Sequence, residues 1–567
     1  MSPRGAPQER DDYDVLVVGS GAAGGAAAHV LTRAGARVLM LEAGGPWDNR
    51  TDSDMFTWPY ETKRRGGWIP SRHFGEFDAC VGGWWLEGEP YTVAEEDEFS
   101  WWRARMVGGR TNHWGRISLR FGPDDFRRGE LDGLSPSWPL SYEDLEPYYD
   151  ELDRFVGIFG SEEGLRNHPD GIFQPPPRPR LYELLVMEAA EARGIPCIPG
   201  RLSILTEPRN GRPACHYCGQ CNRGCSTNSN FSSTNVFVHP AVESGRLTLV
   251  TDAMVREVTV DEEGRATGVH FIDKITGEDR HAEARVVVLA ASAFESVRLL
   301  MNSTSPLFPD GIGASSGHLG RWITDSTGTT VSGHVPRLSG RTRYNEDGAG
   351  GGHVYIPWWL EDTDLDFPRG YHAEVWGGYG QPGAGFMSGI HRYPDFGGYG
   401  RPLKEAYREH YGTVVGFFGR GEMVPNADSY VEIDPEVTDE WGIPALKIHF
   451  SWSDHERLQV KHMQETLRGL IREMGGEPFG EMPGADEGYG ISTGGTIIHE
   501  LGGARMGEDP SESVVDPWLR LHEVPNLYVV DGAPFVSQPD KNPTWTIMAL
   551  AWRTSERILR EMERGRL

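Results

Sequence analysis

The first apolar run of the chain is short and is followed at once by a glycine-rich turn and a helical pattern. Residues 15–18 read VLVV, and an uninterrupted apolar run of this length is typical of a strand buried in a parallel sheet. The alanine-rich segment after the turn predicts a helix that ends near Gly35. A second strand is predicted over residues 37–41, directly before Glu42. The order strand, helix, strand indicates a Rossmann-like α/β domain.

The last part of the chain carries another buried-strand pattern, over residues 527–530. Asp531 and Gly532 follow at the carboxyl end of this strand, which is where ligands bind in an open α/β sheet. A helix is then predicted as far as about residue 562, and it opens on Asn542, Pro543 and Thr544. Proline is tolerated in the first turn of a helix. We therefore expect both ends of the chain to contribute to one domain.

Alternating apolar and polar positions occupy residues 324–338 and 371–378, in the middle of the chain. This alternation predicts an antiparallel sheet. We therefore predict a dinucleotide-binding domain over residues 12–121, 215–320 and 495–567, and a discontinuous α+β substrate domain over residues 122–214 and 321–494. An excursion at about residues 50–100 is rich in tryptophan and acidic residues, and we expect it to form a lid or a partner surface.

Length and charge narrow the possible functions. A chain of 567 residues is too long for one simple core, which agrees with two packed domains. The formal net charge of −28 is spread along the chain and argues against nucleic-acid binding, because phosphate would be repelled. No apolar run is long enough to predict a membrane span. The first residues lack the apolar stretch of a secretory signal, so we expect a cytoplasmic protein, with export to the periplasm beside a signal-bearing partner as the alternative.

The glycine-rich turn has the spacing of a dinucleotide-binding fingerprint. Gly19 permits the turn, Gly21 lets the backbone approach a pyrophosphate, and Gly24 lets helix and strand pack closely. The helix N-terminus offers unpaired N–H groups and the positive end of its dipole to phosphate. Glu42 would accept hydrogen bonds from the adenosine ribose. The cofactor contacts predicted from this unit are Gly19, Gly21, Ala22, Ala23, Gly24 and Glu42.

Together these motifs resemble the glucose–methanol–choline oxidoreductase family over nearly the whole chain. The resemblance implies FAD as the dinucleotide and a C-terminal catalytic pair, a histidine with a second histidine or an asparagine. His499 in HELGGARMG matches the first position and Asn542 in NPTWTIMAL matches the second. Residues 287–300 resemble a second FAD-binding signature of the family, but Ser292 stands where glycine is usual.

The expected chemistry suits this pair. Oxidation of an alcohol requires loss of the hydroxyl proton as hydride leaves the carbon for flavin N5. An imidazole such as that of His499 titrates near neutrality and can accept the proton. The amide of Asn542 can donate a hydrogen bond to the developing alkoxide, and Pro543 biases Asn542 away from helical dihedral angles. The alternative role for Asn542 is to cap the final helix.

A second glycine-rich loop, GGRTNHWGR at residues 108–116, is suited to lying against a flat ring or a phosphate. The family has a similar loop beside the flavin. In some members the histidine that matches His113 is bonded covalently to the flavin, and in others FAD is held without such a bond. The cofactor contacts predicted from here are Gly108, Gly109, Thr111, Asn112 and His113. The remaining predicted contacts are Val255, Asp531, Gly532, Asn542, Pro543 and Thr544.

Four of the six cysteines form the run C-x2-C-x2-C-x3-C, at Cys215, Cys218, Cys221 and Cys225. Disulfides are disfavoured by the short spacings and a reducing cytoplasm, and structural zinc usually uses two separated pairs of ligands. The spacing is close to that of bacterial ferredoxins. Some family members carry a [3Fe–4S] cluster at the corresponding place, so we predict a [3Fe–4S] or [4Fe–4S] cluster. The alternatives are a reduced thiol-rich loop and a zinc site.

The resemblance also implies a sugar or glycoside substrate that is oxidised at a secondary hydroxyl, because the His/Asn pair is similar to that of pyranose-oxidising members. Carbon 3 is one candidate position for this hydroxyl. Electrons would leave through the cluster to a small subunit or a cytochrome c. The rival hypotheses are an oxygen-using oxidase without a cluster and an electron-transfer subunit without a substrate. Side chains suited to a polyol ring, or to ordinary sheet packing, are Tyr355, Trp358, Trp359, His372, Glu374 and Trp376.

Overall fold

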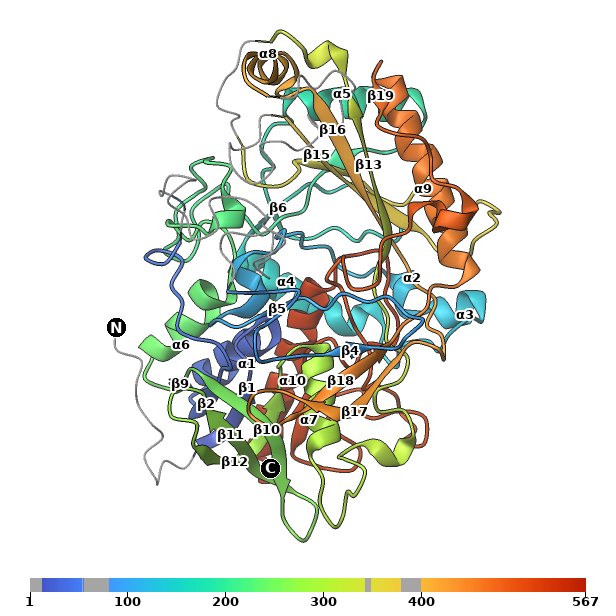
Figure 1. The fold of residues 1–567 in the computed structure, drawn as a ribbon. Coiled ribbons are helices and arrows are strands. Elements are labelled where there is room, and N and C mark those ends of the chain that lie inside the picture. The colour runs from blue at the N-terminus through green and yellow to red at the C-terminus, as the bar shows by residue number, and fades with distance from the viewer. Residues whose placement is uncertain (1–12, 54, 56–80, 342–347, 379–398) are drawn as a thin grey trace.

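The computed structural model describes residues 13–53, 55, 81–341, 348–378 and 399–567. Two sheets organise this part of the chain (Figure 1): a seven-stranded sheet in the lower half of the view and a six-stranded sheet in the upper half. About half of the predicted lid or partner surface at residues 50–100, namely residues 54 and 56–80, lies outside the described residues.

The seven-stranded sheet has the order β10-β11-β12-β1-β2-β9, and β20 pairs with β12. Strands β1, β2, β9, β12 and β20 pair in parallel, and β10, β11 and β12 form an antiparallel meander. The bounds of these strands are β1 Tyr13–Val18, β2 Val38–Leu41, β9 Leu247–Val250, β10 Ala253–Val260, β11 Ala266–Asp273, β12 Asp279–Leu289 and β20 Leu527–Val529. This arrangement confirms the Rossmann-like prediction.

Helix α1 (Ala22–Arg33) crosses from β1 to β2, and α10 (Thr544–Glu563) packs against it. Close approach at the start of α1 depends on Gly24, because a Cβ there would lie 2.0 Å from the carbonyl oxygen of Gly19. Strand β1 is apolar throughout its centre, and Val15, Leu16 and Val17 are fully buried. The apolar run and the glycine spacing seen in the sequence therefore produce the unit predicted from them.

The six-stranded sheet is antiparallel, as the alternation in the sequence predicts, and has the order β19-β13-β16-β15-β14-β8. Helices α5 (Leu181–Ala192) and α9 (Asp454–Glu473) pack with each other, and α9 packs on β13 and β16. The strand bounds are β8 Ile198–Pro199, β13 Thr327–His334, β14 Val354–Ile356, β15 Tyr371–Gly377, β16 Val414–Gly421 and β19 Glu477–Pro478.

Strand β15 presents two different faces because successive side chains of a strand point to opposite sides. Tyr371, Ala373 and Val375 belong to the apolar cluster that includes residues of α5 and α9. The alternate set, His372, Glu374 and Trp376, lines cavities on the other face of the sheet. The polar face of this strand therefore provides side chains for the site.

The other named helices and strands connect or flank these sheets, and β17, β18 and β4 form a three-stranded sheet. None of the described helices is long and apolar enough to cross a membrane. The bounds of these elements are β3 Gly82–Gly83, β4 Thr92–Val93, β5 Arg103–Ala104, α2 Pro123–Phe126, α3 Arg128–Asp132, α4 Tyr142–Val156, β6 Ile158–Phe159, β7 Phe173–Gln174, α6 His239–Glu243, α7 Ala293–Asn302, α8 Arg401–His410, β17 Tyr430–Thr438 and β18 Pro444–His449.

All strands of the seven-stranded sheet lie in the three segments assigned from the sequence to the dinucleotide-binding domain. All strands of the six-stranded sheet lie in the two segments assigned to the substrate domain. The domain boundaries themselves stay a prediction.

Candidate active site

A cavity of about 860 Å³ extends from the carboxyl ends of β1 and β2 to the six-stranded sheet. A volume of this size is typical of small-molecule and cofactor sites. Most residues predicted to contact the cofactor, together with both members of the predicted catalytic pair, lie on its wall. They are Gly19, Gly21, Ala22, Ala23, Glu42, Gly109, Thr111, His113, Val255, His499, Asp531, Gly532, Asn542, Pro543 and Thr544.

The end of the cavity at α1 is built to receive an anion. Gly19 adopts a φ of 98°, in the region that favours glycine, and turns the chain into the helix. No side chain caps the first N–H groups of α1 and its first turn contains no acidic residue. A Cβ built on Gly21 would meet no atom within 4 Å, so the space before the helix is open. These features fit the pyrophosphate of a dinucleotide.

Glu42 forms part of the wall beside this turn. Its Oε2 accepts a hydrogen bond from the backbone N–H of Ser20 at 3.0 Å, and its Oε1 accepts one from the N–H of Gly44 at 2.8 Å. The carboxylate therefore links the turn after β1 to the turn after β2. This position at the end of β2 is where a dinucleotide site places its ribose-binding acid.

Three predicted contacts shape the site without lining the cavity. Gly24 allows the close packing of α1 described above. Gly108 has a φ of 87°, and a Cβ there would lie 1.9 Å from Oγ1 of Thr234. Asn112 is fully buried, and its amide donates to the carbonyl oxygen of Val107 at 2.9 Å. These residues hold the loop that presents Thr111 and His113 to the cavity.

His113 is almost fully buried and its Nε2 accepts a hydrogen bond from Nε1 of Trp102 at 2.9 Å. This bond fixes the ring at the cavity wall. Ser292, which replaces the glycine usual in the family signature, keeps the backbone that glycine would adopt, with a φ of 93°. Its N–H donates to Oδ2 of Asp531 at 3.2 Å, and this contact ties the start of α7 to the carboxyl end of β20.

The predicted catalytic pair is assembled beside this site. The Nδ2 atom of Asn542 lies 3.4 Å from Nε2 of His499 and 3.1 Å from Oε1 of Glu374. A carboxylate oxygen can only accept, so Glu374 determines that the NH2 side of the Asn542 amide faces both neighbours. Asn542 does not cap α10, whose N-cap residue is Pro543.

The surroundings of His499 assign its tautomer. An NH2 group directed at Nε2 requires a lone pair on that atom, so the proton of the neutral ring is on Nδ1. Nδ1 lies 2.8 Å from Oγ of Ser326, which also accepts a hydrogen bond from Nε2 of Gln538 at 3.3 Å. Ser326 therefore holds the ring at Nδ1, and Nε2 is directed at Asn542.

Electrostatics favour the neutral form of His499 and the ionised form of Glu374. Burial and the nearby cation of Arg420 lower the pKa of His499 to about 3. Burial alone would raise the pKa of Glu374, but Arg420, His372 and the amide of Asn542 outweigh it and lower this pKa to about 2. The site thus contains an uncharged imidazole, that of His499, and an ionised carboxylate, that of Glu374.

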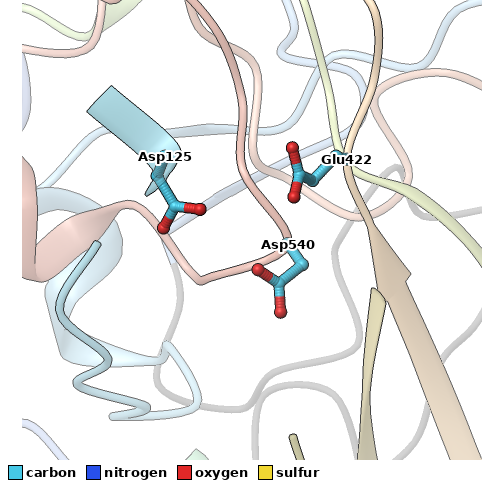
Figure 2. Close-up of side chains that lie close together, drawn as sticks. All are labelled: Asp125, Glu422 and Asp540. Carbon is cyan, nitrogen blue, oxygen red and sulfur yellow. The ribbon is translucent and has the colours of Figure 1, made fainter. Parts of the chain in front are cut away.

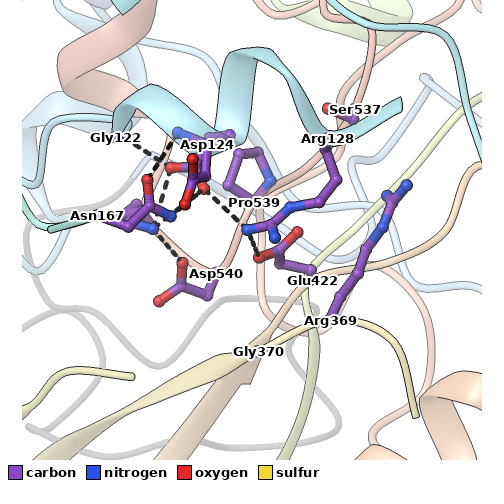
Figure 3. A network of polar contacts seen from close by, with 12 residues as sticks. Gly122, Asp124, Arg128, Asn167, Arg369, Gly370, Glu422, Ser537, Pro539 and Asp540 are labelled. Carbon is purple, nitrogen blue, oxygen red and sulfur yellow. Dashed lines mark hydrogen bonds and ion pairs between the residues drawn. The ribbon is translucent and has the colours of Figure 1, made fainter. Parts of the chain in front are cut away.

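Three buried carboxylates, Asp125, Glu422 and Asp540, lie close together (Figure 2). Nζ of Lys541 lies 2.7 Å from Oδ1 of Asp540 and 3.0 Å from Oδ2 of Asp125. Arg128 contacts Glu422 at 2.9 Å (Figure 3). The cations that this cluster requires are therefore side chains. We assign it a structural role, not a metal site.

This network continues to the catalytic pair through His372. Its Nδ1 lies 3.6 Å from Oδ2 of Asp540, and its Nε2 lies 3.4 Å from Oε1 of Glu374. Burial would lower the pKa of His372, but the two carboxylates raise it above its usual value. The buried side chains of His372 and Asp540 thereby link Glu374 to the loop that carries Asn542.

The four predicted cluster cysteines lie on one loop, where Cys225 is buried and the others are half-buried. Burial raises the pKa of Cys215 to about 12 and that of Cys218 to about 11. The buried guanidinium of Arg116 faces Cys221 and Cys225. The guanidinium donates to the carbonyl oxygens of Trp114 and Asn112, and among the described residues no carboxylate forms an ion pair with it.

Sequence reasoning missed Ser326, Gln538 and Arg420, which orient His499 or set the charge around it. No local motif marks them. Of the proposed substrate contacts, Trp358 and Trp359 do not line this cavity. Their rings pack against Tyr371, with centroids 5.1 Å and 5.8 Å away, so these two side chains belong to the sheet's apolar cluster.

Comparison with known proteins decides the family. Sequence profiles of the glucose–methanol–choline (GMC) oxidoreductase family match residues 13–321 and 425–551, which together include most of the chain. The chain is a member of the GMC oxidoreductase family. This GMC oxidoreductase is an FAD-dependent enzyme that acts on the CH–OH group of alcohols or sugars.

Relatives of this GMC oxidoreductase have several activities. It is 32% identical to a 2-methyl-1,2-propanediol dehydrogenase of Mycolicibacterium austroafricanum, covering 97% of this chain and 96% of that protein. It is 27% identical to the fructose dehydrogenase large subunit of Gluconobacter japonicus, covering 97% and 98%. A C-glycoside 3-oxidase of Microbacterium trichothecenolyticum is 27% identical over 56% of this chain and 54% of that protein.

The fold agrees with solved structures. A formate oxidase of Aspergillus oryzae RIB40 superposes with a TM-score of 0.66 at 16% identity, covering 98% of this chain and 99% of that one. At this identity the likeness concerns the fold alone. The FAD of the family fits the large cavity, because the uncapped start of α1 and the open space at Gly21 suit its pyrophosphate.

Proposed function

We propose that this GMC oxidoreductase is a dehydrogenase that oxidises a secondary hydroxyl of a sugar or glycoside, at carbon 3. The observation that carries the proposal is the assembly of His499, Asn542 and Glu374 on the wall of the FAD cavity. Bound FAD supplies the acceptor for the hydride. The residues of the chain then have to bind the substrate, hold its hydroxyl and remove one proton.

His499 is the proposed base. Its Nε2 carries a lone pair, and Ser326 holds the opposite side of the ring. The 3.4 Å contact between Nε2 and the Asn542 amide is the longer of the two that this amide makes. A substrate hydroxyl placed between them would donate its proton to Nε2 and accept a hydrogen bond from Nδ2. That bond strengthens as the oxygen becomes an alkoxide.

The lining of the substrate side supports a hydroxylated ring. Glu374 and Arg420 offer an acceptor and donors, and the ring of Phe418 adds apolar surface. Relatives named as a fructose dehydrogenase and a C-glycoside 3-oxidase support a sugar and, for the second, carbon 3. The relative named for a small diol makes a simple alcohol the alternative substrate.

We propose further that Cys215, Cys218, Cys221 and Cys225 supply the ligands of a [3Fe–4S] or [4Fe–4S] cluster. The buried Arg116 supports this, because thiolates bound to iron would give its cation the anionic neighbour that the described carboxylates do not provide. The loop 108–116 connects Arg116 directly to the flavin-side residue His113. Electrons would pass from the flavin site through the cluster to a small subunit or a cytochrome c.

Anaerobic titration of the purified enzyme tests the proposal. The panel contains methyl glycosides, free sugars, 2-methyl-1,2-propanediol and simple polyols, and the flavin absorption is followed. We expect sugars or glycosides to bleach the flavin and the product to be a ketone at carbon 3. Bleaching by the diol and by no sugar would overturn the sugar proposal. Peroxide formation in air at the rate seen with artificial acceptors would identify an oxidase instead.

A further inference from the structure

A second cavity, of about 360 Å³, lies between the polar face of β15 and the cysteine loop. The two cavities share part of their walls, because both are lined by Gly115, Ile117, Glu374 and Phe418. At its other end it is lined by Cys218 and Gly219. The wall thus includes both the carboxylate that orients Asn542 and part of the predicted cluster loop.

Two buried polar atoms on this wall have no partner among the described residues. They are Oη of Tyr355 and Nε1 of Trp376. The Tyr355 side chain is only 5% exposed, and the residue stands directly opposite Glu374 in the β14–β15 register. A buried hydroxyl or indole N–H without a hydrogen bond is costly, so such groups in a cavity indicate a missing ligand.

The charges around the cavity indicate that this ligand is neutral. Arg180 pairs with Glu183 at 3.3 Å, and Arg201 pairs with Asp170 at 3.0 Å. Glu374 is balanced by Arg420, 4.0 Å away, and by His372. The wall therefore offers single hydrogen-bonding groups and aromatic surface from Tyr182 and Trp376, which suits a hydroxylated ring better than a phosphate or a carboxylate.

We propose that the second cavity binds the second unit of a two-part substrate, a neutral hydroxylated ring joined to the one oxidised at His499. Tyr355 and Trp376 are its specificity-determining residues. Their side chains share a sheet face with Glu374, so one molecule can contact all three. The inference rests on the proposed function and defines its substrate as a disaccharide or comparable glycoside.

The test compares matched substrates in steady-state assays with an artificial acceptor. The probes are methyl glucosides and methyl galactosides of both linkages, each paired with a disaccharide that carries the same ring. The variants Tyr355→Phe and Trp376→Phe keep an aromatic ring and remove one hydrogen-bonding group each. We expect each to lower kcat/KM for the disaccharide about tenfold and to leave kcat/KM for the methyl glycoside unchanged.

Tyr371→Phe is the matched control, because its hydroxyl lies on the opposite face of β15 beside His462. It should leave the ratio of the two kcat/KM values unaltered. An equal effect of Tyr355→Phe on both substrates, or no effect on either, would overturn the second subsite while leaving sugar oxidation intact. If no sugar reduces the flavin of the unaltered enzyme, the proposed function itself fails, and the subsite with it.

Discussion

The amide nitrogen of Asn542 lies 3.1 Å from Oε1 of Glu374, and this contact decides which side of the amide faces His499. The oxygen of the same amide is buried and has no hydrogen-bond partner among the described residues. A reversed amide would set two oxygens against each other. Glu374 thus positions Asn542, and Asn542 in turn fixes the lone pair on His499.

Replacing Glu374 by glutamine should disturb this arrangement, because a carboxamide can face Asn542 with either its oxygen or its NH2 group. We expect Glu374→Gln to lower kcat by about tenfold to a hundredfold, with FAD content unchanged. Rapid-mixing measurement of flavin reduction checks this. Glu432→Gln, at a half-exposed carboxylate on β17, is the control. An unchanged reduction rate in Glu374→Gln would show that the amide is oriented by other means.

The depressed pKa of His499 predicts a flat pH profile. A histidine with the ordinary value of 6.5 would lose its basic form as the pH falls below that value, but a pKa of about 3 keeps the ring neutral. We therefore expect no inflection from His499 in kcat/KM between about pH 5 and about pH 8.

The variant His499→Gln should lower the rate of flavin reduction by about 10²- to 10⁴-fold throughout this range. The comparison requires equal FAD content in both proteins. A wild-type profile that falls with an apparent pKa near 6.5, and is flattened in the variant, would contradict the neutral-ring prediction.

Changes in the cysteine loop should separate substrate oxidation from electron export. We expect Cys218→Ser and Cys225→Ser to lose iron and acid-labile sulfide and to slow electron transfer to cytochrome c by at least about tenfold. Flavin reduction in a single turnover should persist. Cys197→Ser is the matched control, because Cys197 packs against the α5–α9 cluster outside the loop. Unaltered iron content in the loop variants would refute the ligand assignment.

Backbone strain at Ser292 predicts a stabilising substitution. A φ of 93° suits glycine, so Ser292→Gly should raise the free energy of unfolding by about 1 kcal/mol. Ser339, with a φ of −67°, provides the opposite case, and Ser339→Gly should lower stability slightly. Denaturant titration measures both. A loss of stability in Ser292→Gly would mean that the serine side chain contributes more than its backbone costs.

The charge of Lys541 should be essential for folding stability. Lys541→Met leaves Asp125 and Asp540 buried without their ammonium, so we expect a loss of about 3–5 kcal/mol. Lys404→Met, at an exposed position on α8, should have little effect. Thermal unfolding compares the two variants with the parent.

Because Lys541 and Arg128 between them contact all three carboxylates, millimolar Mg²⁺ or Ca²⁺ should not raise the unfolding temperature of the unaltered protein. Chelation should not lower it either. A clear stabilisation by either ion would show that the three carboxylates bind a metal after all.

The sequence by itself determined the parts of this protein that depend on neighbouring residues. The apolar run before Gly19 and the spacing to Gly24 specify a strand, a tight turn and a closely packed helix, because these depend on backbone dihedral angles and on short-range packing. Alternation over residues 371–378 likewise predicted which side chains of β15 share a face. His499 and Asn542 could be found because each lies in a local motif.

Only the tertiary structure decided what surrounds that pair. Ser326 directly precedes β13 and Glu374 lies on β15, so both are far from His499 along the chain. No periodicity in the sequence shows which face of a sheet will line a cavity of the folded protein. The same reason explains why Trp358 and Trp359 fitted a substrate site in the sequence but pack in the apolar cluster. Contacts between distant segments depend on how the two sheets are placed together, and that placement is decided by the whole core.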